Sequence, residues 1–138
     1  MKERRIGAAA AIIIVAIVVC AIILLRGGAS SLSAYPGAQK LAEQSFTGYT
    51  AKLYSFTGSG EDVYSWYKSR MLAEGWSLDY DGGYIKGEGC LLNYTKGGGV
   101  ATIIVSESEA AISTQEETFG VAVPSGSKTI FLAQGPRL

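Results

Sequence analysis

Residues 6–25 are the feature that most limits what this chain can fold into, because the twenty positions from Ile6 to Leu25 contain no acid and no base. Twelve of them are isoleucine, valine or leucine, and six are alanine. A helix of this length rises about 30 Å, the thickness of the hydrocarbon core of a bilayer. A helix of a soluble domain would show a polar face, and this run has none. The sequence therefore predicts a transmembrane helix over Ile6–Leu25.

The charges beside this run predict its orientation. Lys2, Arg4 and Arg5 precede it within residues 1–5, whereas Arg26 alone follows it. Because basic segments stay on the cytoplasmic side, the N-terminus is expected in the cytoplasm and the rest of the chain outside it. We expect a single-pass signal-anchor protein of the cell membrane.

Three other uses of the apolar run are open. Gly27-Gly28-Ala29 offers the small residues of a signal-peptide cleavage site, although the apolar core of a signal peptide is usually only about 7–15 residues long. Arg5-Ile6-Gly7 suits a processed pilin-like subunit, but the glutamate that bacterial pilins carry just inside the helix is missing. Cys20 gives only a weak match to a lipoprotein site, since Val18-Val19 precedes it.

Composition divides the rest of the chain into a tether and one domain. Residues 26–34 include GGASSLSA and predict a flexible tether, and residues 35–138 are long enough for one small domain. The chain has 12 basic and 12 acidic residues, but from residue 27 onward there are eight basic and eleven acidic ones. A mildly acidic domain lacks the basic face that nucleic acid requires, so we expect no nucleic-acid partner.

One amphipathic helix is predicted over residues 60–74. Val63, Trp66, Tyr67 and Met71 fall on one helical face. Ser59 and Asp62 resemble a capping box at its start, and Gly75 is expected just after its end.

Short stretches of alternating or β-branched residues, separated by glycine-rich turns, predict strands. They are residues 39–46, 49–57, 76–80, 90–96, 100–106, 120–123 and 128–133, with 90–106 and 120–133 expected as hairpins and 107–117 as a loop or short helix. For residues 39–46 the alternative is one helical turn at Leu41-Ala42-Glu43. The predicted fold class is α+β: an N-terminal transmembrane helix, then a two-layer domain of one helix packed on a mostly antiparallel sheet of five to seven strands.

Three motifs stand in order along the domain: Tyr35-Pro36-Gly37-Ala38, then Glu61-Asp62-Val63 with Trp66-Tyr67-Lys68, then Gly75-Trp76. They resemble a group of small membrane- or lipid-anchored extracytoplasmic domains of bacteria and methanogenic archaea, whose function is unknown. That group shares a YPGA opening, a V-x-x-[FW]-Y-K helix that ends in GW, and an antiparallel sheet. The resemblance covers residues 35–106 and implies an extracytoplasmic domain without catalytic residues.

The residue types limit the chemistry that is available. Histidine is absent, and Cys20 and Cys90 are the only cysteines, placed by this reading in the membrane and outside it. The common Ser–His–Asp, Cys–His and zinc sites are therefore excluded, and we expect no catalytic, metal or cofactor site and no enzyme. Asp79, Asp81 and Glu88 do not have the spacing of a calcium loop.

Two sets of residues are candidate sites. Trp66, Tyr67 and Trp76 are expected as core residues or as the lining of a ligand groove. Asn93 begins an Asn93-Tyr94-Thr95 sequon and is a candidate for glycosylation. The function expected is that of a membrane-anchored binding or interaction module at the cell envelope, with a protein partner there. The alternative is a structural subunit of a membrane or pilin-like assembly.

Overall fold

A computed structural model gives the structure of residues 32–46 and 48–136, which form six strands and two helices. In chain order they are β1 Gln39–Phe46, β2 Tyr49–Phe56, α2 Gly60–Ala73, β3 Ser77–Asp81, β4 Gly89–Lys96, β5 Gly99–Ser106, α3 Glu109–Phe119 and β6 Lys128–Pro136.

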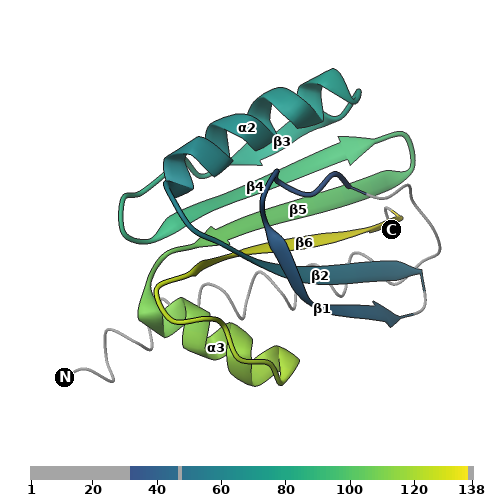
Figure 1. Cartoon of the computed structure of the whole chain (residues 1–138). Helices are drawn as coiled ribbons and strands as arrows, with labels where there is room; N and C mark the ends of the chain where they lie inside the picture. The colour runs from purple at the N-terminus through teal and green to yellow at the C-terminus, as the bar shows by residue number, and fades with distance from the viewer. Residues whose placement is uncertain (1–31, 47, 137–138) are drawn as a thin grey trace.

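All six strands join one antiparallel sheet in the order β1-β2-β6-β5-β4-β3. The C-terminal strand β6 lies in the middle of the sheet, between β2 and β5, and β1 and β3 form the two edges (Figure 1). The predicted β4–β5 hairpin is confirmed. Lys96 pairs with Gly99, and Gly97 has the positive φ of +57° that the first position of a type II′ turn requires.

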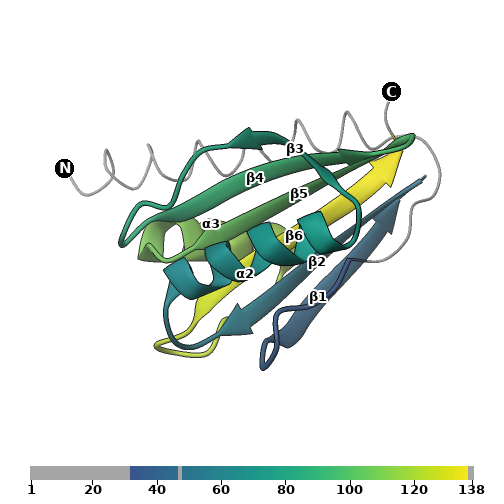
Figure 2. The ribbon, with the colours of Figure 1, turned by 90° about the horizontal axis from the view of Figure 1, so that it is seen from above.

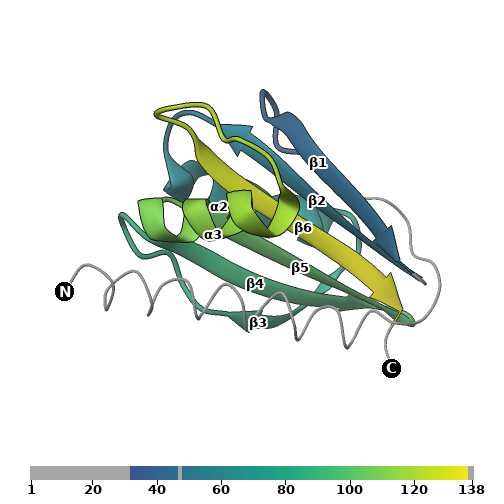
Figure 3. The ribbon, with the colours of Figure 1, turned by 90° about the horizontal axis from the view of Figure 1, so that it is seen from below.

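The two helices cover opposite faces of the sheet, so the domain has three layers (Figure 1). Seen from above, α2 crosses in front of the strands, and seen from below, α3 does (Figures 2 and 3). The predicted two-layer architecture with one helix is therefore wrong, although the class, α+β, agrees. The second face needs a cover because Leu53, Ile104 and Phe131 project from it and are at most 2% exposed.

The transmembrane part of the predicted fold is also not supported. Among residues 32–46 and 48–136 there is no helix that is both long enough and apolar enough to span a membrane. The predicted helix over Ile6–Leu25 lies outside the described residues. The fold that the structure supports is thus a six-stranded antiparallel sheet with a helix on each face.

Helix α2 begins and ends as its sequence predicts. The Ser59 hydroxyl accepts hydrogen bonds from the N–H groups of Glu61 and Asp62, which have no partner inside the helix. At the other end Gly75 has a φ of +91°, and the N–H of Trp76 donates to the Met71 carbonyl in a Schellman motif. The helix therefore ends one turn before β3. The chain then turns back and forms the edge strand of the sheet.

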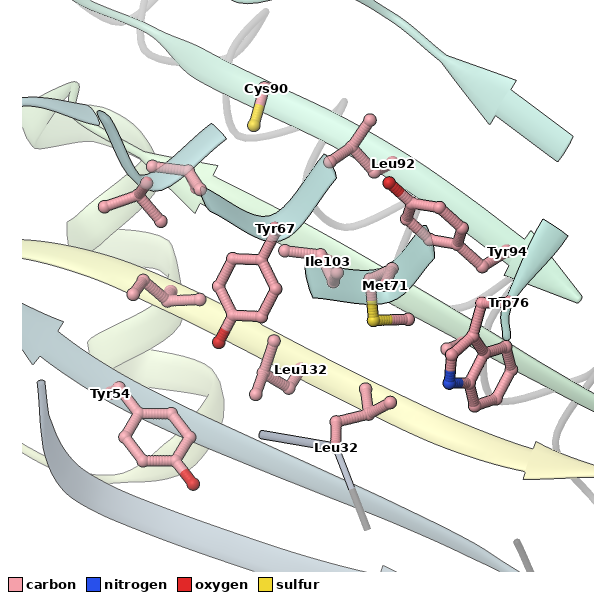
Figure 4. Packing of buried hydrophobic residues seen from close by; sticks show 14 of the residues in the cluster. Leu32, Tyr54, Tyr67, Met71, Trp76, Cys90, Leu92, Tyr94, Ile103 and Leu132 are labelled. Atoms are coloured by element: carbon pink, nitrogen blue, oxygen red, sulfur yellow. The ribbon is translucent and has the colours of Figure 1, made fainter. Parts of the chain in front are cut away.

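The larger core lies between α2 and the sheet (Figure 4). Tyr67 and Met71 of the helix are at most 1% exposed and face Leu92, Ile103 and Leu132 of three neighbouring strands. These side chains fix the position of α2 over strands β4, β5 and β6.

The packed domain begins earlier than predicted, because Leu32 is 8% exposed within the same core. Ser33 beside it donates a hydrogen bond to the Glu74 carboxylate, 2.8 Å, and its carbonyl accepts one from the Tyr67 hydroxyl, 2.9 Å. Residues 32 and 33, at the end of the predicted tether, thus belong to the folded domain.

The predicted C-terminal hairpin is not formed. Residues 120–123 make no strand, and the N–H of Val123 donates instead to the Glu116 carboxylate of α3, 2.7 Å. A hydrogen bond to a side chain takes the donor that a strand would need for its neighbour. Residues 120–127 therefore connect α3 to β6 as a loop.

Candidate binding surface

The three aromatic residues predicted as core or groove all belong to the core on the α2 side of the sheet, with Trp66 at its margin. Tyr67 is fully buried and Trp76 is 5% exposed. Trp66 is half-buried, with its ring edge-on to Tyr35 and Tyr67 at centroid distances of 5.5 and 4.8 Å, and the Arg70 guanidinium lies 5.7 Å from it. The rings fill space against one another and against the sheet, and their described contacts are all with other residues of the domain.

Asn93, the sequon residue, lies inside strand β4, between β3 and β5. Its side-chain oxygen accepts a hydrogen bond of 2.7 Å from the Thr102 hydroxyl on the neighbouring strand. Tyr94, the middle residue of the sequon, is 2% exposed. Modification of Asn93 stays a prediction. In the folded domain this segment is paired with a strand on each side.

Cys90 is buried on the face that α2 covers, and burial raises the pKa of its thiol to about 12. At neutral pH such a thiol is protonated and a poor nucleophile. Asp79, Asp81 and Glu88 do not come together, since the described residues contain no group of three or more Asp, Glu, Cys or His side chains placed to hold a metal ion.

A buried carboxylate that the sequence did not single out holds the start of α2. The side chain of Glu107, 6% exposed, accepts hydrogen bonds from the N–H of Gly60 at 3.0 Å and from the N–H of Gly87 at 3.1 Å. The Tyr84 hydroxyl donates to it at 2.6 Å, and Lys128 Nζ lies 3.5 Å away. One side chain thus ties together the helix, the loop between β3 and β4, and strands β5 and β6.

These donors decide the charge of Glu107. Burial by itself raises the pKa of the carboxyl group, but the hydrogen bonds from Tyr84, Gly87 and Gly60 and the charge of Lys128 bring that pKa below its usual value. In return, the hydrogen bond to Glu107 raises the pKa of Tyr84 to about 12. Glu107 is therefore ionised, and Tyr84 protonated, at neutral pH.

A second carboxylate, Asp81, joins the edge strand β3 to α2. It accepts hydrogen bonds from the Tyr64 hydroxyl, 2.9 Å to each oxygen, and from the N–H of Gly83, 2.8 Å. Lys68 Nζ lies 2.9 Å from it, and this ion pair lowers the pKa of Asp81. The Tyr64 and Tyr84 rings are 6.3 Å apart, so the two carboxylate clusters are neighbours.

Four large hydrophobic side chains of the described residues project into solvent, and all lie between residues 72 and 85. They are Leu72, 73% exposed, at the end of α2; Leu78 and Tyr80, 46% and 52% exposed, on β3; and Ile85, 57% exposed, in the following loop. We call these four residues the β3 surface. Leu78 and Tyr80 belong to β3, the edge strand with a partner strand on one side only (Figures 1 and 2), and Leu72 and Ile85 lie in the segments before and after it.

A β-bulge gives this edge apolar side chains on both of its faces. Leu78 pairs with Tyr94 and Tyr80 with Asn93, so Asp79 is the extra residue between them. Tyr94 faces α2 and Asn93 faces the opposite side, and directly paired residues share a face. Leu78 therefore lies on the α2 side of the edge and Tyr80 on the other.

The arrangement of these residues is suited to binding another molecule through exposed side chains. The carboxylates of Asp81 and Glu107 are each saturated by donors from the protein, and they hold β3 and its loop in place. The apolar side chains that they position are exposed. Exposed apolar side chains that gather along one segment, instead of being scattered singly, are a feature of interaction sites.

Comparisons of the chain with protein-family models, curated proteins and solved structures find no match. The resemblance carried by residues 35–106 accordingly stays a prediction.

The sequence contained weak signals for the residues that hold this surface. Glu107 follows directly on the most apolar strand of the domain, a position at which the chain has just left the core. Tyr64 and Lys68 are one helical turn apart, off the buried face of α2. Their partner Asp81 lies 17 and 13 residues further along the chain, so only the fold identifies the pairs.

Proposed function

We propose that this chain is an interaction module of the cell envelope that binds a partner protein through the β3 surface. The observation that carries the proposal is the concentration of all four exposed large hydrophobic side chains of the described residues between positions 72 and 85. A chance distribution would scatter such residues singly over the domain.

The location is part of the proposal and rests on the sequence. The uncharged apolar run of residues 6–25 would hold the chain at the cell membrane, and Lys2, Arg4 and Arg5 favour the extracytoplasmic side for the domain. A partner in the envelope would then meet the domain close to the membrane, within the short reach of the tether.

Preorganisation supports a binding role for this edge. The Asp81 cluster fixes β3 to α2, and the Glu107 cluster fixes the loop that carries Ile85. A surface that is already ordered loses little conformational entropy when a partner binds. Strand β3 would therefore present its apolar side chains in one arrangement.

Site-specific photocrosslinking in native membranes tests this function. A benzophenone amino acid placed at Leu78 of the full-length chain should give a discrete adduct with another protein, because this side chain would be covered in the complex. The matched control carries the same probe at Ser45, an exposed position on the opposite edge strand β1, and should give none. Equal labelling from the two edges would contradict the proposal, and an adduct between two copies of the chain would favour the structural-subunit alternative.

A further inference from the structure

The unpaired charge at the β3 surface points to the chemistry of the partner. Lys68 and Asp81 neutralise one another at 2.9 Å. Asp79 is exposed and makes no ion pair with any other described residue. It stands between Leu78 and Tyr80 in the strand, at the bulge. Because Leu78 and Tyr80 lie on opposite faces of the edge, a partner that covers both crosses the edge of β3 at Asp79.

Removing the Asp79 carboxylate from water costs free energy, which a cation on the partner would offset. A carboxylate taken out of water without a partner is strongly unfavourable, whereas a lysine or arginine opposite it restores the lost interactions. Glu88, which is exposed and has no ion pair among the described residues, lies in the loop that follows Ile85. Lys86 in the same loop and Lys96 at the end of β4 are nearby cations without an ion pair there, and Lys96 Nζ donates to the Glu74 carbonyl at 2.7 Å. Between Leu78 and Tyr80 themselves, the free charge is that of Asp79.

A second copy of the chain fits this edge poorly. Antiparallel pairing of β3 with itself about a two-fold axis at Asp79 would place Asp79 opposite Asp79, and an axis at Tyr80 would place it opposite Asp81. Like charges directly opposite one another destabilise a strand pair. The short, bulged and acidic strand thus has three features with which edge strands avoid self-association.

A lipid surface fits poorly as well. Hydrocarbon offers no donor to the Asp79 carboxylate and no partner to the free backbone groups of an edge strand. Anionic headgroups would repel the acidic residues of the loop and strand. A protein segment satisfies both needs, since it brings side-chain cations and backbone groups together.

We infer that the partner of the β3 surface is a cationic protein segment, with apolar side chains that cover Leu78 and Tyr80 and a lysine or arginine that pairs with Asp79. This inference rests on the proposed function and names the chemistry of its partner. The contact should weaken as salt is added, because Asp79 lies at the exposed edge of the site.

The test places the photoreactive residue at Tyr80 of the full-length chain in native membranes and combines it with three substitutions. Asp79→Asn removes the charge and should lower the adduct yield at least about tenfold, since it leaves the partner's cation unpaired. Asp79→Glu keeps the charge and should retain most of the yield. Glu117→Gln removes an exposed acid from α3, which packs over β5 and β6 rather than β3, and should change nothing.

The outcomes separate the inference from the proposed function. A protein adduct whose yield is the same with Asp79→Asn, or whose crosslinked peptide contains no lysine or arginine, overturns the cationic partner and leaves the binding role of the surface intact. An adduct with lipid, or with a second copy of the chain, overturns the inference in favour of that occupant. Absence of any adduct from Leu78 and Tyr80 alike removes both the inference and the proposed function. An unchanged thermal unfolding curve of each variant confirms that the fold is retained.

Discussion

At the scale of single residues, Glu107 is the side chain on which most of the architecture depends. Its carboxylate accepts a hydrogen bond from the first N–H group of α2, which has no acceptor inside the helix, and it does so from the residue directly after strand β5. The negative charge also lies at the positive end of the helix dipole. A single buried acid thereby couples helix, loop and sheet.

We expect Glu107→Gln to destabilise the domain by roughly 1.5–3 kcal/mol at pH 7, because it removes the charge from hydrogen bonds donated by Gly60, Gly87 and Tyr84. Thermal unfolding followed by circular dichroism measures the change. Glu117→Gln, an exposed substitution of the same kind, should shift the free energy of unfolding by less than about 0.5 kcal/mol. Equal unfolding curves for the two variants would contradict this role of Glu107.

The same carboxylate predicts a pH dependence. The folded-state pKa of Glu107 lies below its unfolded value, so its contribution to stability is present above about pH 4.3 and is lost as the pH falls through the folded-state pKa. The difference in melting temperature between the wild-type chain and Glu107→Gln should therefore be constant from pH 7 to about pH 5 and shrink below that. A difference that stays the same down to pH 3 would show that charge is not its source.

Gly60 is required by the approach of Glu107. A Cβ atom at this position would lie 2.3 Å from Glu107 Oε2, inside contact distance. Gly60→Ala should consequently destabilise the domain by about 1–3 kcal/mol, although alanine normally stabilises a helix relative to glycine. Gly98→Ala is the control, because a Cβ atom there meets nothing within 4 Å. Urea unfolding compares the two, and a stabilised Gly60→Ala variant would refute the close approach.

At the scale of elements, α3 is held to the sheet by a buried polar side chain as well as by apolar packing. Gln115 is fully buried, its Nε2 donates to the Ser106 hydroxyl at 3.3 Å, and its Oε1 accepts a hydrogen bond from the Thr129 hydroxyl. These hydroxyls belong to neighbouring strands, β5 and β6, and are opposite one another. The helix is thus centred over one pair of strands.

Replacing Gln115 by leucine should loosen α3 selectively. The Ser106 and Thr129 hydroxyls would lose this partner inside the protein, at a cost of about 1–3 kcal/mol. We expect amide hydrogen exchange in residues 109–119 to accelerate several-fold more than exchange in β5. Ser113→Ala, an exposed change in the same helix, should leave the exchange pattern as it is. Uniform acceleration throughout the sheet would show that α3 is not an independently opening unit.

At the scale of the whole molecule, the segment before β1 contributes to the core between α2 and the sheet. Leu32 is 8% exposed, and the next residue supplies the acceptor for the buried Tyr67 hydroxyl. The chain therefore reaches the domain at the C-terminal end of α2, where Ser33 also binds Glu74. The end of α2 that carries Leu72 is thus next to the point at which residues 1–31 join.

Leu32→Ala in the full-length chain should lower the free energy of unfolding by about 2–5 kcal/mol, as for other buried leucines. Leu72→Ala makes the same chemical change at a side chain that is 73% exposed, and should have an effect of less than about 0.5 kcal/mol. Guanidinium unfolding monitored by tryptophan fluorescence distinguishes the two. Similar losses at both positions would place Leu32 outside the core.

The sequence by itself determined the elements that are defined by local chemistry. The 3.6-residue period of Val63, Tyr67 and Met71 predicted α2, and Ser59 and Gly75 predicted its ends. Glycine-rich turns, with β-branched and aromatic residues between them, located β2, β4 and β5 to within a residue. In each case the determining residues are neighbours along the chain. Residues 39–46 have no β-branched residue, and pairing with β2 decides that they form β1.

Only the tertiary structure decided what depends on residues far apart in the chain. Helix α3 was not predicted as a layer because its sequence is polar, and only Ala111 and Gln115 are buried. Strand β6 enters the centre of the sheet by pairing with β2, which precedes it by more than seventy residues. The same long-range pairing makes β3 an edge strand and brings Glu107 to Gly60. The β3 surface exists for that reason: its side chains are exposed because of where the sheet ends, and no local pattern specifies that position.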